Sequence, residues 1–149
     1  MGGRALALAV MVAMAVTAAA QPALAATPKV HISRVTLQAA GVTVHQLPRG
    51  VPVTFAVTYR VRHLSARARC RAAVTIELRR LTSRFDLATP RSSTYARTGT
   101  YVWPVGGGAV RIDARYPPGT YRLTIRVRVL KPSGRVVASD IYRGRVQVI

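Results

Sequence analysis

The stretch Gly119-Thr-Tyr-Arg-Leu-Thr-Ile-Arg-Val-Arg-Val-Leu130 alternates apolar residues with arginine and threonine. Successive side chains of a β-strand point to opposite faces, so this period of two predicts a strand with one apolar and one cationic face. The apolar set is Tyr121, Leu123, Ile125, Val127 and Val129, and the cationic set includes Arg122, Arg126 and Arg128. The segment therefore predicts both an all-β fold and a basic outer surface.

Similar alternation and turn residues recur along most of the chain. A Lys131-Pro-Ser-Gly134 turn should fold the final strand back onto residues 119–130 as a hairpin, with a bulge at Gly144. Residues 82–93 are expected to form a loop, in which Phe85 and Leu87 could make a brief edge strand. The other expected strands cover residues 30–37, 42–47, 53–61, 74–79, 94–103, 110–114 and 136–149. The pattern predicts an antiparallel sandwich of about seven to nine strands.

Two segments resemble fibronectin type III and related immunoglobulin-like domains of bacterial exported proteins. The Pro118-Gly-Thr-Tyr-Arg-Leu123 segment is similar to the turn and the tyrosine-led penultimate strand of these domains. The Gly50 to Tyr59 segment resembles their second strand. The resemblance implies an Ig-like sandwich and a tyrosine corner, in which the Tyr121 hydroxyl binds upstream backbone. The alternative for Tyr121 is a simple core tyrosine. Trp103 lies later in the chain than the core tryptophan of those families, and no cysteine pair bridges the sheets.

The first 25 residues have the features of a secretory signal peptide. Arg4 precedes an uncharged apolar run, and Ala23-Leu-Ala25 fits a signal-peptidase cleavage site. The run is short and alanine-rich for an uncleaved membrane anchor. We therefore expect residues 26–149 to form one β-sandwich domain that is secreted or held in the cell envelope, without a transmembrane span after cleavage near Ala25.

The chain is strongly basic. It has 23 lysine and arginine residues but only four acids, and its formal net charge is +19. Only Lys29 and Lys131 are lysines; arginine has GC-rich codons, so genome composition could explain part of the arginine bias, but not the scarcity of acids. The expected partners are acidic cell-envelope polymers or a protein, without sequence-specific recognition of nucleic acids.

Catalytic and metal-binding patterns are missing from the sequence. His31, His45 and His63 lie in separate segments, without metal-ligand spacing. We therefore predict no enzyme, no metal and no cofactor. Cys70, within Arg67-Ala-Arg-Cys-Arg71, could be a reactive thiol, an intermolecular disulfide partner or an unreactive cysteine under a loop, and a redox activity there is one alternative function.

The remaining candidate site is the set of arginines on the expected strands and on the basic connector, which covers residues 65–71. In an Ig-like sandwich they would lie outside both sheets, which fits salt-sensitive attraction to a polyanion better than one focused site. A solvated surface without a ligand, or protein recognition through a sheet edge or the 82–93 loop, are the alternatives. The candidate polyanion contacts are Arg60, Arg62, Arg67, Arg69, Arg71, Arg79, Arg122, Arg126 and Arg128.

Overall fold

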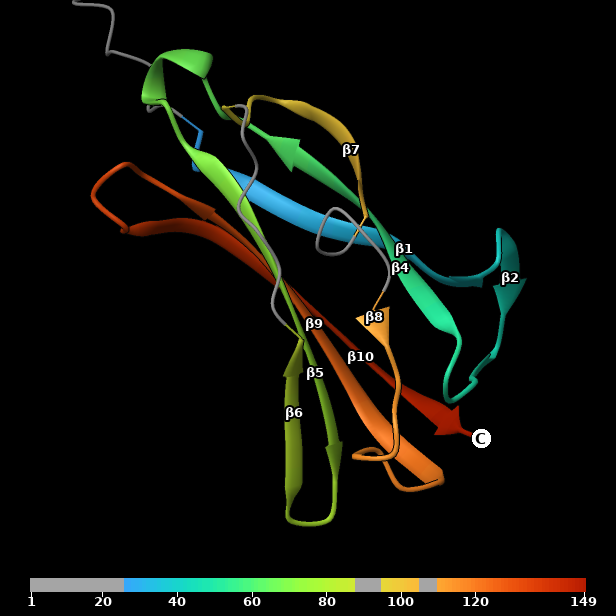
Figure 1. The fold of residues 1–149 in the computed structure, drawn as a ribbon. Helices are drawn as coiled ribbons and strands as arrows, with labels where there is room; N and C mark the ends of the chain where they lie inside the picture. Colours follow the sequence, from blue (N-terminus) through green and yellow to red (C-terminus); the bar gives the residue numbers. More distant parts are fainter. Residues whose placement is uncertain (1–25, 88–94, 105–109) are drawn as a thin grey trace, which may run out of the picture.

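The computed structural model describes residues 26–87, 95–104 and 110–149, and these form two β-sheets (Figure 1). The predicted signal peptide, residues 88–93 of the expected loop and the Gly106–Gly108 turn lie outside these ranges. Within them the elements are β1 (Lys29–Ala39), β2 (Val42–Val44), β3 (Gln46–Leu47), β4 (Pro52–Arg62), the 3-10 turn η1 (Ala66–Ala68), β5 (Arg71–Arg80), β6 (Ser83–Leu87), β7 (Gly99–Pro104), β8 (Val110–Arg111), β9 (Gly119–Leu130) and β10 (Val136–Val148).

The strands divide between a first and a second sheet. The first sheet has the order β2-β1-β4-β7, and β8 also pairs with β4. The second sheet has the order β3-β10-β9-β5-β6. In Figure 1, β5, β6, β9 and β10 lie side by side, and β1, β4 and β7 cross them as a separate layer. The prediction of an all-β fold is confirmed, in a sandwich-like arrangement.

The expectation of one strand at residues 42–47 was wrong. The chain bends at His45, so that β2 pairs with β1 in the first sheet, whereas β3 pairs with β10 in the second. The β3–β10 pair is parallel, which makes the second sheet mixed rather than antiparallel. This division helps to raise the strand number in the described residues to ten, above the expected seven to nine.

Part of the expected 82–93 loop is also a strand. Residues 83–87 form β6 and pair with β5, which confirms the brief edge strand at Phe85 and Leu87. The Phe85 ring lies 4.3 Å from the Tyr116 ring, centre to centre. This contact gives the edge strand an aromatic anchor that polar composition does not reveal.

The bulge expected at Gly144 lies elsewhere. Gly144 pairs in register with Leu123, and the irregularity of β10 falls between Val136 and Ala138. A Cβ atom at position 144 would lie 2.8 Å from the Tyr142 hydroxyl oxygen, so the glycine makes room for that side chain. The glycine thus reflects a close approach and not a change of register.

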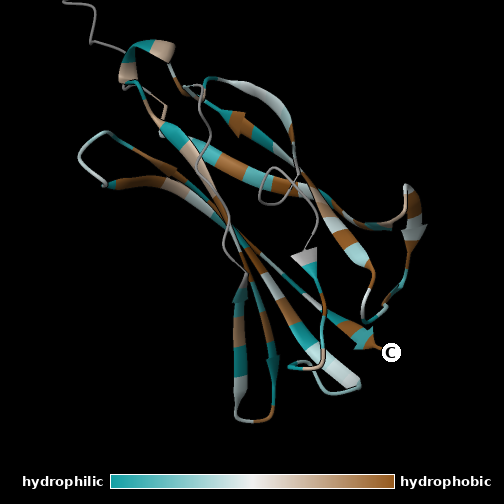
Figure 2. Ribbon diagram, in the orientation of Figure 1, coloured by the Kyte–Doolittle hydropathy of each residue, from teal (hydrophilic) through white to brown (hydrophobic). Residues whose placement is uncertain are grey.

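The apolar faces of both sheets meet in one core. On β4 and β9 every second side chain is buried, as the alternation predicted. Figure 2 shows the corresponding alternation of apolar and polar bands along the strands. Fully buried large side chains include Phe55, Tyr59, Ile76, Leu78, Tyr121 and Leu123. This burial leaves the intervening arginines on the outside.

The expected tyrosine hydrogen bond is present. The Tyr121 hydroxyl donates to the Pro117 carbonyl oxygen at 2.8 Å, four residues upstream. Arg80 donates from the neighbouring strand to the carbonyl oxygens of Pro117 and Pro118. Gly119 has φ +140°, and a Cβ there would lie 2.8 Å from the Arg80 guanidinium carbon. These contacts fix the turn that leads into β9.

Alkaline pH should destabilise the fold through Tyr59. Burial, with a smaller contribution from Tyr101, raises the pKa of Tyr59 to about 12, against about 10 in an unfolded chain. The stabilisation is complete below pH 10 and is lost as pH rises from about 10 to 12, because the unfolded phenol ionises first. We expect a loss of up to about 1.4 kcal/mol per pH unit, measured by urea unfolding.

Tyr59→Phe serves as the control for this titration, since it removes the phenol and keeps the buried ring. Its free energy of unfolding should change much less over the same pH interval. Equal alkaline losses in both proteins would show that Tyr59 is not the group responsible. Tyr116, whose pKa is also raised by burial, leaves a smaller residual slope in both.

Candidate anion-binding surface

Strand register brings three arginines together on the outer face of the second sheet. Arg79 on β5 is directly opposite Arg122 on β9, and Arg122 is directly opposite Arg145 on β10. Their neighbours Leu78, Tyr121 and Val146 are buried, so the three arginines face outward. Adjacent strands lie about 4.8 Å apart. We call Arg79, Arg122 and Arg145 the arginine row.

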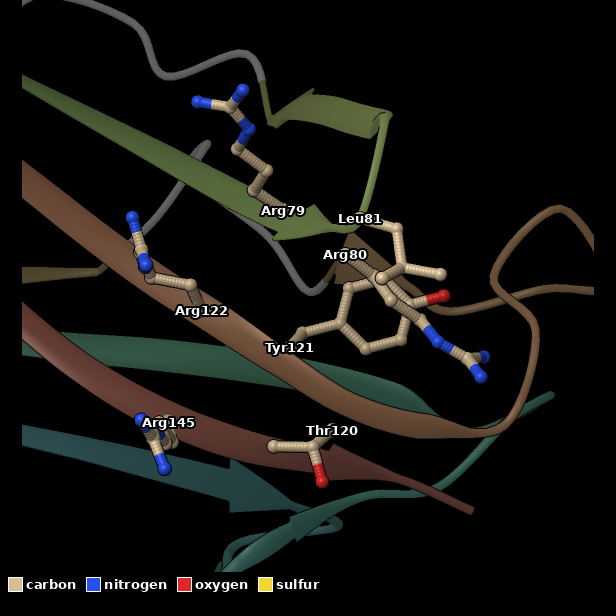
Figure 3. Close-up of a pocket in the computed structure, with 7 residues that line it drawn as sticks. All are labelled: Arg79, Arg80, Leu81, Thr120, Tyr121, Arg122 and Arg145. Atoms are coloured by element: carbon tan, nitrogen blue, oxygen red, sulfur yellow. The ribbon is translucent and has the colours of Figure 1, made fainter.

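The arginine row borders a hollow at one end of the sheet. The hollow has a volume of about 630 Å³ and is also lined by Arg80, Leu81, Thr120 and Tyr121. Figure 3 shows the three row residues projecting from three neighbouring strands, whereas Arg80 runs past the Tyr121 ring in another direction. Arg80 is held by the turn carbonyl groups. The row, and not Arg80, therefore supplies cationic groups toward solvent.

The acids of the chain do not neutralise the arginine row. Arg84 contacts both Glu77, at 2.8 Å, and Asp86, at 3.1 Å. Asp113 pairs with Arg115, whose hydrogen bonds hold the pKa of Asp113 below its usual value. Asp140 contacts His31. Within the described residues, no carboxylate is within ion-pairing distance of the row.

Like charges directly opposite each other destabilise a sheet. In the arginine row this occurs twice in succession, at Arg79 with Arg122 and at Arg122 with Arg145. A bound anion would remove the repulsion, because a guanidinium group donates paired hydrogen bonds to an oxyanion. The row therefore has both the donors and the unbalanced charge of an anion site.

The other predicted contacts are distributed over the molecule. Arg126 and Arg128 lie further along the outer face of β9, on the same sheet as the row. Arg60 and Arg62 lie on β4 of the first sheet, where they line a separate hollow of about 260 Å³ with Lys29 and His31. The structure thus places positive charge on both sheets, as expected, but within the described residues it aligns arginines on neighbouring strands only in the second. Arg84 on β6 continues this line opposite Arg79, but its guanidinium is paired with Glu77 and Asp86.

The basic connector forms a third cationic region. Arg67 lies in η1, and Arg69 ends this turn in the left-handed conformation. The Arg71 guanidinium lies over the Tyr95 ring, 4.7 Å from its centre. Arg69, Arg71 and Lys131 line a hollow of about 300 Å³ beside this ring. Its mixture of aromatic and cationic groups distinguishes it from the arginine row.

Arg145 is the residue of the row that sequence reasoning missed. It follows Gly144, where a bulge was expected, and it was not among the predicted contacts. The intact register of β10 sets Arg145 opposite Arg122. The sequence does contain a signal for Arg145. Val146 and Val148 are apolar and two residues apart, so a strand that buries them points Arg145 and Gln147 outward.

Cys70 lies within the core. Its side chain is fully buried, and its sulfur lies 3.7 Å from the Ala68 carbonyl oxygen. This placement fits an unreactive cysteine beneath the connector, because disulfide exchange requires access to the sulfur. A reaction at Cys70 would need local opening of residues 65–71.

The described residues form neither a metal-binding cluster nor a membrane-spanning helix. Among the described residues, no group of three or more histidine, cysteine or acidic side chains could hold a metal ion. The same part of the chain contains no helix that is long and apolar enough to cross a membrane. No protein-family model matches the sequence, and no curated protein shows significant similarity to it.

Proposed function

We propose that this protein is an exported, non-enzymatic β-sandwich module that binds acidic polymers of the cell envelope through electrostatic contacts. The observation that carries the proposal is the arginine row, in which three outward arginines on adjacent strands have no carboxylate partner within the described residues. The signal-peptide pattern of residues 1–25 supports a location outside the cytoplasmic membrane. The scattered histidines and acids support a binding role over catalysis.

We further propose that the sandwich is of the fibronectin type III or immunoglobulin-like kind. Pairing of β1, β4 and β7 in one sheet and of β6, β5, β9 and β10 in the other agrees with such domains. The Tyr121 hydrogen bond to Pro117 agrees with their tyrosine corner. Modules of this kind place binding groups on sheet faces, edges and loops, so the arginine row occupies a suitable position.

Charge-matched variants of the predicted mature chain, residues 26–149, test the binding proposal. The row variant carries Arg79→Gln, Arg122→Gln and Arg145→Gln. We expect it to leave immobilised polyphosphate and polyglutamate columns at clearly lower salt than the wild type, because fewer counterions are released on binding. On polyphosphate, the slope of log affinity against log salt should fall by about 2 to 3.

A control variant with Arg34→Gln, Arg49→Gln and Arg97→Gln loses the same charge at positions outside the second sheet, none of which is a candidate polyanion contact. Those three residues are also exposed. The control should elute nearer the wild type. Equal losses in the two variants would mean that net charge alone attracts the polymer, and retention that does not weaken with salt would overturn the electrostatic proposal. Specific capture of one protein at high salt would favour recognition through a sheet edge.

A further inference from the structure

We infer, on the basis of the proposed function, that the arginine row binds a linear phosphate polymer that lacks aromatic bases. The polymer would cross β5, β9 and β10, so that successive phosphate groups contact Arg79, Arg122 and Arg145. The inference adds a ligand class and a direction to the proposed binding. Three features of the structure support it: the hydrogen-bond donors around the row, the positions of the neighbouring acids, and the side chains that border the row.

The polar groups around the row are predominantly donors. The Thr120 hydroxyl donates to Gln147 Oε1 at 2.8 Å, which occupies the acceptor end of that amide. Thr120 and Gln147 are paired on β9 and β10, one outward position from Arg122 and Arg145. The Gln147 amide nitrogen is then free to donate beside three guanidinium groups. Such a lining suits a ligand that only accepts hydrogen bonds, as a phosphodiester does.

Phosphate fits adjacent guanidinium groups better than carboxylate does. A carboxylate offers two oxygens in one plane and accepts one guanidinium fork, whereas tetrahedral phosphate oxygens can accept from two sides. Guanidinium groups on neighbouring strands start from backbones about 4.8 Å apart. One phosphate can thus bridge Arg79 and Arg122, and the next can bridge Arg122 and Arg145.

The neighbouring acids set the direction of the polymer. Glu77 lies two residues before Arg79 on the same face of β5, and it is paired across strands with Asp86. A polyanion that ran along β5 from Arg79 would meet both carboxylates, which are held together by Arg84. A polyanion that crosses the strands stays in the acid-free row. Repulsion on one side therefore favours the crossing direction.

Among the described residues that line the hollow, no exposed aromatic ring offers a surface for base stacking. Proteins that bind single-stranded nucleic acids place aromatic rings along the basic groove. Here the aromatic residue of the hollow, Tyr121, is fully buried. The exposed side chain at the border is Leu81, which is 87% exposed and has φ +49° in the β5–β6 turn. An aliphatic border suits the carbon segments of a polyol phosphate and not a base.

An arginine-to-lysine variant separates phosphate recognition from charge. Arg79→Lys, Arg122→Lys and Arg145→Lys keep three positive charges but remove the planar forks. We expect this variant to bind polyphosphate about tenfold more weakly than the wild type and to lose clearly less affinity for polyglutamate, because each carboxylate engages one guanidinium fork whereas each phosphate bridges two. Affinities would be measured by fluorescence anisotropy with labelled polymers of equal charge number, for variants whose thermal unfolding matches the wild type. Arg34→Lys, Arg49→Lys and Arg97→Lys, three exposed positions outside the second sheet, form the matched control.

A labelled oligothymidylate of equal phosphate number supplies the third probe. We expect the wild type to bind it more weakly than polyphosphate, because no ring stacks on the bases. Tighter binding of the oligonucleotide would overturn the inference, as would equal losses on polyphosphate and polyglutamate in the lysine variant. Either result leaves the proposed polyanion binding intact. Failure of the wild type to bind any of the three polymers would refute both.

Discussion

Tyr121→Ala is expected to lower the free energy of unfolding by about 4 kcal/mol, the largest effect of any substitution considered. The Tyr121 side chain is fully buried in the core, and none of its surface is accessible to solvent. Removal of a buried aromatic side chain leaves a cavity and costs about 3 to 5 kcal/mol. The hydrogen bond to Pro117 is lost as well. Urea unfolding followed by circular dichroism measures the change.

Two further variants divide this effect between packing and the hydrogen bond. Tyr121→Phe keeps the ring and should cost only about 1 kcal/mol, because Arg80 still donates to the Pro117 carbonyl. Tyr142→Ala removes a tyrosine that is 38% exposed on β10 and should cost clearly less than Tyr121→Ala. If Tyr121→Ala unfolded at the same urea concentration as the wild type, the turn and the core would not depend on this residue.

Period-two alternation predicted the strands that form the centre of each sheet. Along β4 and β9 large apolar residues occupy every second position, so the burial of these strands follows directly from the sequence. The division of the arginines between the two sheets also followed from that alternation. The local pattern is sufficient there, because the face of the sheet to which a side chain points depends only on its position in its own strand.

Pairing between strands could not be predicted in the same way. The apolar alternation of residues 42–47 shifts by one position between Val44 and Leu47, but this shift does not reveal that β2 and β3 pair with different sheets. The alignment of Arg79, Arg122 and Arg145 likewise depends on the registers of two strand pairs. Long-range pairing decides these features, and a single sequence does not record it. The candidate site was therefore predicted as a set of residues but not as a row.

Asp140 is the second residue at which we expect a large loss of stability. Its Oδ2 atom accepts a hydrogen bond from the Ile32 backbone nitrogen at 2.7 Å and lies 3.3 Å from His31 Nδ1. Asp140 is on β10 of the second sheet, whereas Ile32 is on β1 of the first. The carboxylate thus connects the two sheets at a position where β1 has no neighbouring strand on that side, since β2 pairs only with residues 37–39.

Asp140→Ala should lower the free energy of unfolding by about 3 kcal/mol, because it removes a charged acceptor and leaves the Ile32 amide without its partner. Asp140→Asn keeps an acceptor and should cost less than half as much. Asp86→Ala is the control: it removes an exposed acid from its ion pair with Arg84, and such pairs contribute at most about 1 kcal/mol.

The order of these three losses distinguishes a specific contact from general charge repulsion, because net charge changes equally in Asp140→Ala and Asp86→Ala. If the scarcity of acids were the main source of instability in so basic a chain, both variants would be destabilised alike through increased repulsion. A much larger loss at Asp140 would instead assign the effect to the contact between sheets. Equal losses in urea unfolding at low salt, which disappear together at high salt, would show that general repulsion dominates and that the Ile32 contact contributes little.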